Sequence, residues 1–466
     1  MSRSPNDRER DALLSGGSAL EAQPPQESFM RRLLAVPAAI IPISLFSFGG
    51  PPAHLALAHD TFKKWLSDER FLEMLSIASA LPGPSSTQVV TSMGLLHAGP
   101  LGGLVAFFFW MLPGFTIMTL AGIGAKTYLH DGLPGWMAGF APAAVSLVVI
   151  AAVRLWQKAV GEDVAKGFVA ALSSCVILAT QGLSSAIFPL VLLTGGLVIL
   201  LLNATGHTHT AISAEKTSSS HLERYGDWLV RDYRTDEPLS LRWLLVRFSQ
   251  IGISPLAGVV IVVAWFAGLV LLAVFHPQDA GEHTLVSMFY TFYWIGSIIF
   301  GGGQVMLPML LNDIVARGWV SKEQFLAGFA LIQSLPGPLF NISAYLGALL
   351  YGPVGALLAA AGLFGPGISL FFGLLPLWER VRDNLQLKIF LAGVNAAATG
   401  LVVASIFLLG EKAVHSNGGA AVGLATGFMV AVFKVPAPLA IVVGGIIGFL
   451  LTPSVLNLGQ QDFCAP

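Results

Sequence analysis

The stretch Phe46-Ser-Phe-Gly-Gly-Pro-Pro52, together with Leu81-Pro-Gly-Pro84 further along, decides the fold of this chain. The second half repeats both motifs, as Phe300-Gly-Gly-Gly-Gln304 and Leu335-Pro-Gly-Pro338. All four motifs lie within runs that are apolar enough for a lipid bilayer. Helix-breaking motifs at corresponding places in two halves of a hydrophobic chain point to the binding site of a secondary transporter.

The composition predicts an all-α polytopic membrane protein. The 466 residues are 55% hydrophobic and 11% charged, with a mean hydropathy of +0.73, whereas soluble domains carry roughly 25% charged residues. The 51 glycines and 27 prolines suit close helix packing and broken helices, which membrane spans tolerate. Cys175 and Cys464 are the only cysteines, so neither a disulfide framework nor a thiolate metal site is expected, and no cofactor is predicted.

The chain is an internal duplication. The stretch from Trp65 to Phe71 matches Trp319 to Phe325 at an offset of 254 residues. The glycine motifs match at an offset of 252, and Gly-Pro and Pro-Gly pairs further along match at 253. Ordered matches with so little drift predict two repeats of about six membrane segments each. The first segments of the repeats are expected at 34–58 and 71–97, and at 285–311 and 323–350.

The predicted organisation has five parts. They are a disordered cytosolic tail (1–33), an N-terminal transporter repeat (34–203), a cytosolic linker (204–247), a connecting transmembrane helix (248–275) and a C-terminal transporter repeat (285–453). Because a single helix separates two repeats of even number, the second repeat is expected to be inverted. The N-terminus and the linker are then cytosolic and the C-terminus lies outside.

The positive-inside rule supports this topology. With thirteen crossings, 20 of the 25 basic residues face the cytosol. The five on the outside are Lys63, Lys64, Arg70, Lys126 and Lys412. In an alternative topology, both Pro-Gly-Pro segments are re-entrant hairpins, which leaves eleven crossings and moves the basic linker outside; the charge distribution favours it less.

Each Pro-Gly-Pro motif is expected to break its helix. Proline removes a backbone donor and disfavours helical conformation in the preceding residue. The second half-helix then begins with free N–H groups at the positive end of its dipole, which is an anion site. The alternative is a kinked helix whose loose ends are satisfied by neighbours, with the glycines serving as helix contacts. The predicted substrate-binding residues are Gly49, Gly50, Pro51, His54, Pro82, Gly83, Pro84, Ser85, Ser86, Thr87, Gly301, Gly302, Gly303, Gln304, Pro336, Gly337, Pro338 and Asn341.

Two ionisable residues leave alternatives open. His54 could carry a proton near neutral pH, or it could be an interfacial side chain with satisfied hydrogen bonds. Arg154 could bind an anion or could extend to the cytosolic face, and the second interpretation is favoured. The chain has no GxxxxGK[ST], HExxH or GxSxG motif, so we do not expect ATP-driven transport or these enzyme chemistries. Uphill transport would use an ion gradient or the membrane potential.

These motifs resemble the chromate ion transporter (CHR) superfamily in its long, two-domain form, over nearly all of residues 34–453. The resemblance implies a secondary transporter that exports chromate from the cytoplasm across the bacterial inner membrane and confers chromate resistance. It also implies sulfate as an analogue and coupling to the proton gradient or membrane potential. Besides the anion, protons, the bilayer and a second copy of the chain are the expected partners.

Three functions remain distinct at this stage. The first is a chromate exporter with both Pro-Gly-Pro breaks at one midplane site. The second is a sulfate or oxyanion permease, or an anion channel, that uses the same breaks. The third is a membrane enzyme or scaffold, which the absence of a catalytic pair disfavours.

Overall fold

The computed structural model describes residues 28–48, 50–128, 139–205, 252–275, 284–381, 384–414 and 416–451. Within these ranges every regular element is a helix, as the composition predicts. Seven helices in the described part of the chain are long and apolar enough to cross a membrane. Residues 1–27 of the predicted tail, Gly49 and nearly all of the predicted linker lie outside the described residues. The first helix begins at Phe29, inside the predicted tail.

In the described residues the first repeat contains seven α-helices and one π-helix. They are α2 (Phe29–Phe46), α3 (Pro51–Phe62), α4 (Asp68–Ala80), α5 (Ser85–Tyr128), α6 (Phe140–Leu155) with the π-helix η2 (Trp156–Val160), α7 (Val164–Ala179) and α8 (Ile187–Ala204). Ser67 and Asp163 cap α4 and α7 by accepting hydrogen bonds from backbone N–H groups of the first turn. The connecting helix α11 (Pro255–Phe275) follows.

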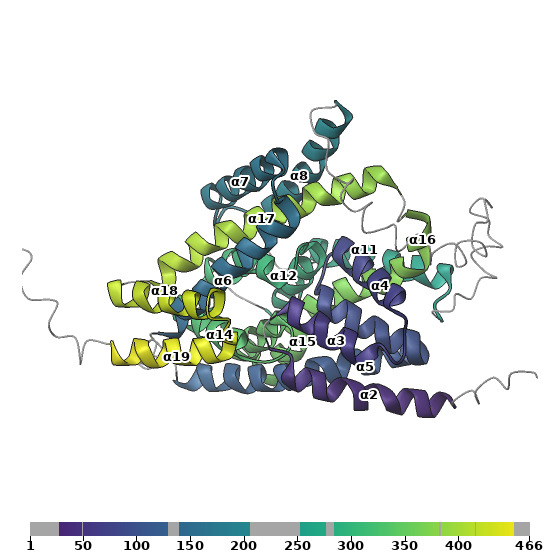
Figure 1. Cartoon of the computed structure of the whole chain (residues 1–466), viewed down its shortest axis with the longest axis horizontal. Coiled ribbons are helices and arrows are strands. Elements are labelled where there is room, and N and C mark those ends of the chain that lie inside the picture. The colour runs from purple at the N-terminus through teal and green to yellow at the C-terminus, as the bar shows by residue number, and fades with distance from the viewer. Residues whose placement is uncertain are drawn as a thin grey trace, which may run out of the picture.

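The second repeat reproduces this order. It contains α12 (Leu285–Ile298), η4 (Gly303–Val305), α13 (Met306–Leu310), η5 (Leu311–Val315), α14 (Lys322–Ser334), η6 (Leu339–Asn341), α15 (Ile342–Leu374), η7 (Leu375–Leu377), α16 (Trp378–Val381), α17 (Leu385–Ala413), α18 (Asn417–Ala431) and α19 (Ala437–Leu450). Helix α14 matches α4 residue for residue at the offset of 254. In Figure 1, α5 and α15 lie beside each other, and α17 passes beside α7 and α8.

The broken motifs adopt the same backbone conformation in both repeats. Gly83 and Gly337 have φ of 120° and 98°, and Gly99 and Gly352 have φ of 70° and 64°. Only glycine adopts such values without strain. The predicted duplication and the predicted breaks at Pro-Gly-Pro are therefore confirmed in three dimensions.

Helix α5 is two antiparallel helices joined by a sharp turn at Ala98 and Gly99. A Cβ on Gly94 would lie 2.4 Å from the carbonyl oxygen of Gly102, so residues 85–98 and 100–128 are in backbone contact. Further from the turn, the Trp110 indole donates to the Thr87 hydroxyl (3.3 Å). Helix α15 turns in the same way at Gly352.

The helices before this turn form two hairpins. At one level Arg32 donates to the carbonyl oxygen of His97, and the Trp65 ring stacks on the His97 ring with centroids 3.9 Å apart. At the other level His54 contacts both Ser47 and Ser86. Helix α2 therefore runs from the first level to the second, α3 returns, α4 descends again, and residues 85–98 return once more.

This geometry corrects the predicted spans 34–58 and 71–97. Each is a pair of helices that begins and ends at the same level, and not one straight span, because Arg32 and Trp65 both contact His97 whereas His54 contacts Ser47 and Ser86. The matching elements of the second repeat correct 285–311 and 323–350 in the same way. The alternative topology, with hairpins at the Pro-Gly-Pro segments, agrees better with the structure. It did not include the hairpins that contain the glycine motifs.

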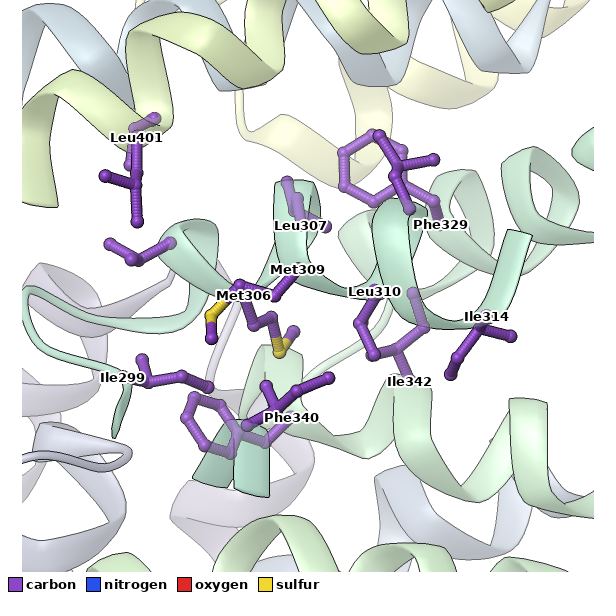
Figure 2. Close-up of a cluster of buried hydrophobic side chains, with 14 of the residues drawn as sticks. Ile299, Met306, Leu307, Met309, Leu310, Ile314, Phe329, Phe340, Ile342 and Leu401 are labelled. Atoms are coloured by element: carbon purple, nitrogen blue, oxygen red, sulfur yellow. The ribbon is translucent and has the colours of Figure 1, made fainter. Parts of the chain in front are cut away.

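The broken segment of the second repeat lies in the hydrophobic centre of the protein. Figure 2 shows Met306, Leu307 and Leu310 of α13 directed among Ile299, Phe340 and Phe329, and each of these side chains is at most 1% exposed. Burial of such side chains contributes about 1.5–3 kcal/mol each. This packing holds the non-helical backbone next to α13 in place.

Candidate functional site

The broken motifs of the two repeats are joined by reciprocal hydrogen bonds. The N–H of Gly83 donates to the carbonyl oxygen of Ile299 (2.8 Å), and the N–H of Gly337 donates to that of Ser47 (3.0 Å). Such reciprocity is the mark of an approximate two-fold axis. We call the contact of residues 81–84 with 299–302 the first crossing, and that of 335–338 with Ser47, Phe48 and Gly50 the second crossing.

Glycines allow the backbones to approach closely at both crossings. A Cβ on Gly367 of α15 would lie 2.8 Å from Cα of Gly83, and one on Gly114 of α5 would lie 3.2 Å from the backbone carbonyl oxygen of Pro336. The Gln88 side chain secures the first crossing, because its amide donates to the carbonyl oxygens of Pro82 (2.8 Å) and Gly367 (2.9 Å).

A cavity of about 250 Å³ lies at the first crossing. It is slightly smaller than the roughly 300–1,000 Å³ of drug-sized ligand sites, so it suits a small ion. Its walls come from the first Pro-Gly-Pro loop, the glycine motif of the second repeat, the α6–η2–α7 corner and α17. The lining residues are Ala78, Ser79, Leu81, Gly83, Ser85, Leu155, Lys158, Ala159, Lys166, Gly301, Gly302, Val305, Ala392, Asn395, Ala398 and Thr399.

The cavity has a positive and hydrogen-bonding lining. Lys158 is exposed and forms no ion pair with the other described residues, whereas Lys166 lies 3.6 Å from Asp163. Ser85 stands at the N-terminus of α5, where the first intrahelical bond runs from the N–H of Gln88 to the carbonyl oxygen of Pro84. The unpaired N–H groups of this first turn add partial positive charge. The arrangement can bind a small anion through both charge and directed donors.

The second crossing keeps a lysine, Lys412, at the position that corresponds to Lys158, but it lacks most of this chemistry. At the offset of 254, the positions that correspond to Ser85, Lys166, Asn395 and Thr399 are Leu339, Ala420, Ala141 and Val145. Four polar lining positions are thus apolar in the other repeat. The two crossings are equivalent in backbone structure, but the polar residues suited to an anion are concentrated at the first crossing.

The predicted site residues are distributed over both crossings. Gly83, Ser85, Gly301 and Gly302 line the cavity, Pro82 and Pro84 belong to the same loop, and Gly303 and Gln304 begin η4 next to it. Ser86 and Thr87 contact His54 and Trp110 instead. Gly50, Pro336, Gly337 and Pro338 belong to the second crossing, and the helices that follow it contain Pro51, His54 and Asn341. Gly49 lies outside the described residues.

His54 is an interior residue. Its side chain is 1% exposed, with Nε2 3.0 Å from the carbonyl oxygen of Ser47 and Nδ1 3.2 Å from the Ser86 hydroxyl. A carbonyl can only accept, so Nε2 carries the proton and Nδ1 accepts from Ser86. The ring joins the two broken segments of the first repeat, and it has satisfied hydrogen bonds as one of its two interpretations expected.

Comparison with known proteins identifies the family. The family model described as chromate transporter matches residues 34–200 and again 286–449, which together are well over half of the chain. The chain belongs to the chromate transporter family. It is a multi-pass integral membrane protein. The two separate matches coincide with the two repeats, so each repeat is one family unit.

Relatives in this family cover both the whole chain and one repeat. A chromate transport protein of Pseudomonas aeruginosa is 26% identical over 446 residues, covering 93% of this chain and 95% of its own length. One of Cupriavidus metallidurans is 23% identical and covers 88% of this chain and 91% of its own. The uncharacterized transporter YwrB of Bacillus subtilis, 29% identical, covers 41% of this chain but 93% of its own length, which is about one repeat. No solved structure matches the chain.

For this member of the chromate transporter family, sequence reasoning missed Lys158, Lys166, Asn395 and Thr399. The two lysines were counted only as positive charge at the cytosolic face. A comparison of the repeats could have found Lys166, Asn395 and Thr399, since polar residues without a polar counterpart mark where duplicated halves differ. The favoured interpretation of Arg154 as a residue that extends to a membrane face is compatible with its exposed position outside the cavity lining.

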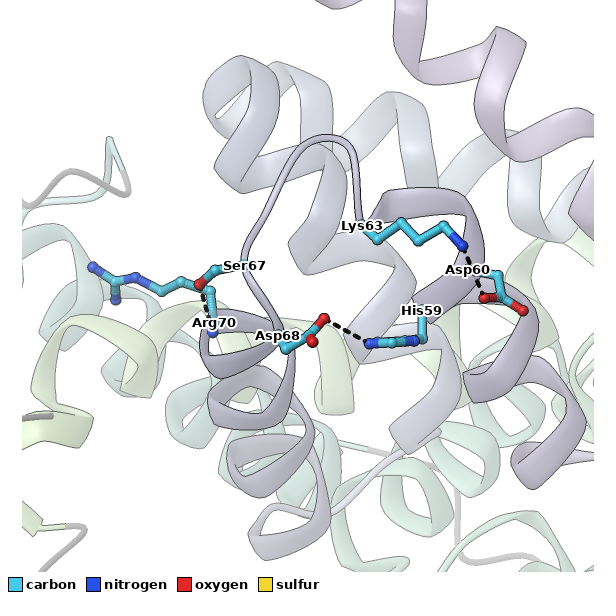
Figure 3. A network of polar contacts seen from close by, with 6 residues as sticks. All are labelled: His59, Asp60, Lys63, Ser67, Asp68 and Arg70. Atoms are coloured by element: carbon cyan, nitrogen blue, oxygen red, sulfur yellow. Dashed lines mark hydrogen bonds and ion pairs between the residues drawn. The ribbon is translucent and has the colours of Figure 1, made fainter. Parts of the chain in front are cut away.

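The tip of the α3–α4 hairpin carries a separate polar network (Figure 3). His59 Nε2 lies 3.0 Å from an Asp68 carboxylate oxygen, and Lys63 lies 3.4 Å from Asp60. These pairs are exposed, and such pairs contribute only about 0–1 kcal/mol. The network secures the turn of the hairpin and does not reach the cavity.

Proposed function

We propose that this chain transports chromate across the membrane through the cavity at the first crossing. The observation that carries the proposal is a broken-helix N-terminus that faces two lysines in one cavity. Chromate is a tetrahedral dianion, and lysine charges, a serine hydroxyl and backbone N–H groups can bind its oxygens from several directions. Sulfate has the same shape and charge, so we propose it as a second substrate. Transport without a covalent step fits the non-enzymatic role of the family.

The re-entrant hairpins support a topology with nine crossings. The crossing elements are residues 100–128 of α5, α6, α7, α8, α11, residues 353–374 of α15, α17, α18 and α19. With a cytosolic N-terminus, 21 of the 25 basic residues face the cytosol. The four on the outside are Lys126, Arg317, Lys322 and Lys412. The linker 204–247 is then cytosolic, the C-terminus lies outside and the second repeat is inverted.

This orientation places the lysine side of the cavity toward the cytosol, because Lys158 and Lys166 lie at the corner between α6 and α7. An anion in the cytosol is attracted into the cavity, and the direction of transport is export across the inner membrane, with chromate resistance as its consequence. A membrane potential that is negative inside favours the exit of a dianion by about 2.3 kcal/mol per charge per 100 mV. A proton gradient is the second energy source that we propose.

Everted membrane vesicles test the proposal. Vesicles with the protein should accumulate radioactive chromate when energised, excess sulfate should compete, and Ser85→Ala or Lys158→Gln should reduce uptake at equal protein levels. An anion channel, the competing function, would also accumulate chromate while a membrane potential persists. With the potential collapsed, a channel could only dissipate a chromate gradient, whereas a proton-coupled transporter could still build one from a pH gradient. Uptake no greater than that of vesicles without the protein would remove chromate as the substrate.

A further inference from the structure

A buried carboxylate joins the two repeats on the side of the protein opposite the cavity. Of the carboxylates whose burial the structure describes, Asp313 alone is buried, with 1% of the residue exposed. It belongs to the π-helix η5, eight residues beyond the cavity residue Val305. Ionisable side chains within membrane segments are costly and mark functional positions by default.

Asp313 and its neighbour hold the turn between α7 and α8. The Ser185 hydroxyl donates to Oδ1 of Asp313, and the N–H of Gly182 donates to Oδ1 of Asn312 (2.6 Å). The Asn312 amide in turn donates to Oδ1 of Asp313 (2.9 Å). Residues of a second-repeat hairpin thereby fasten a first-repeat turn. Since α7 is about 24 Å long and Lys166 lies near its start, this contact is remote from the cavity mouth.

Few charged or titratable side chains lie near Asp313 in the described part of the chain. Arg317 lies 3.7 Å from Oδ1 of Asp313 and is about half exposed. Tyr290 of α12 is close enough to interact electrostatically with both Asp313 and Arg317. All the donors address Oδ1, so Oδ2 is the position where a proton can be added. Charge-assisted hydrogen bonds are roughly twice as strong as neutral ones. Protonation of Oδ2 would therefore weaken the contacts with Ser185, Asn312 and Arg317 together.

We propose that Asp313 is a proton-binding site that controls this contact: the ionised carboxylate keeps the α7–α8 turn fastened to η5, and protonation releases it. This inference rests on the proposed transport function. A transporter whose cavity opens at one membrane face must close that opening and form another at the opposite face before the anion can leave. In the proposed topology the contact lies at the outer face, so protons outside the cell open the exit. The same proton thus links anion release to the proton gradient.

Distances between spin labels test this without any anion. In a background with Cys175→Ser and Cys464→Ser, labels on Ser184→Cys and Lys322→Cys report the separation of the turn from the second repeat in reconstituted protein. We expect one short distance at high pH and a second, longer distance as the pH falls. In Asp313→Asn the longer distance should be present at every pH. In Ser185→Ala, which removes one donor from the carboxylate, it should appear at higher pH.

The matched control is Asp60→Asn, because Asp60 forms the exposed ion pair with Lys63 near the corresponding place in the first repeat. It should keep the full pH response. Distances that are independent of pH, or a response that survives in Asp313→Asn, would overturn the proposal and leave Asp313 a fixed structural residue. Vesicles that lack chromate uptake while the distances still respond to pH would refute the proposed function but not the proton site.

Discussion

The N–H of Gly83 donates to the carbonyl oxygen of Ile299 across the boundary between the repeats, over a distance of 2.8 Å. Gly83 lies in the loop between α4 and α5, and Ile299 caps the C-terminus of α12, so the hydrogen bond satisfies a donor and an acceptor that have no partner within a helix. An unpaired N–H or carbonyl within a membrane protein costs several kcal/mol. The first crossing therefore avoids the cost of an unpaired backbone group at Gly83 and Ile299. It allows a non-helical segment to persist beside the cavity, where donors are needed for an anion.

Substitution of Gly83 by alanine should disrupt this crossing. The residue has φ of 120°, and a Cβ there would lie 2.7 Å from the Gln88 amide nitrogen and 2.8 Å from Cα of Gly367. The backbone strain alone costs about 1–2 kcal/mol, and the collision adds to it. We expect a lowered thermal unfolding temperature in detergent and loss of chromate uptake.

Gly99→Ala is the matched control for that substitution. Gly99 also has positive φ (70°), but nothing lies within 4 Å of the position of its Cβ. It should show the cost of backbone strain without the collision, and so a smaller loss of stability and nearly normal uptake. Equal effects of the two substitutions would show that the close contact of Gly83 with Gly367 has no importance of its own.

The buried amides at the two crossings should respond oppositely to replacement by leucine. Gln88→Leu removes the donor shared by the carbonyl oxygens of Pro82 and Gly367 and leaves both buried, at a cost of about 1–3 kcal/mol each. Asn341 is fully buried, and neither atom of its amide has a hydrogen-bond partner among the described residues. Asn341→Leu should therefore be neutral or stabilising. Thermal unfolding of the two variants, measured side by side, checks the difference in sign.

The duplicated motifs carried most of what the sequence could predict. Gly83 and Gly337 occur in identical local sequences, and local sequence dictates a broken helix at both. The hairpins could not be predicted in this way, because a run such as 34–58 has enough apolar residues to cross a membrane. That the chain turns back within this run is evident only from long-range contacts, such as the stacking of Trp65 on His97. The cavity depends likewise on α17 lying beside α6, a contact between residues more than 200 positions apart.

Lys158→Gln should weaken chromate binding from the cytosolic side. Lys158 lines the cavity and pairs with no carboxylate among the described residues, so no such partner offsets its charge. We expect KM for chromate to rise roughly tenfold, which corresponds to about 1.4 kcal/mol, with a smaller change at high salt because the residue is exposed. Lys64→Gln, an exposed lysine on the α3–α4 turn, is the control and should leave KM unchanged.

The re-entrant hairpins make a sharp prediction about the accessibility of Lys64. Thirteen crossings place Lys64 outside the cell, whereas nine crossings place it in the cytosol, because the α3–α4 turn lies at the level of Arg32 and His97. In a background with both natural cysteines replaced by serine, Lys64→Cys should react with an impermeant maleimide in everted vesicles and not in intact cells.

Two further positions calibrate that experiment, because both topologies agree on them. Lys158→Cys should be labelled from the cytosolic side and Ser184→Cys from the outside. The turn that contains Ser184 supplies independent support, since Gly182 within it donates to Asn312. Thirteen crossings would place the turn outside and the segment after Asn312 inside, so these two groups could not meet at 2.6 Å. Labelling of Lys64→Cys only in intact cells would refute the hairpins and, with them, the cytosolic orientation of the cavity.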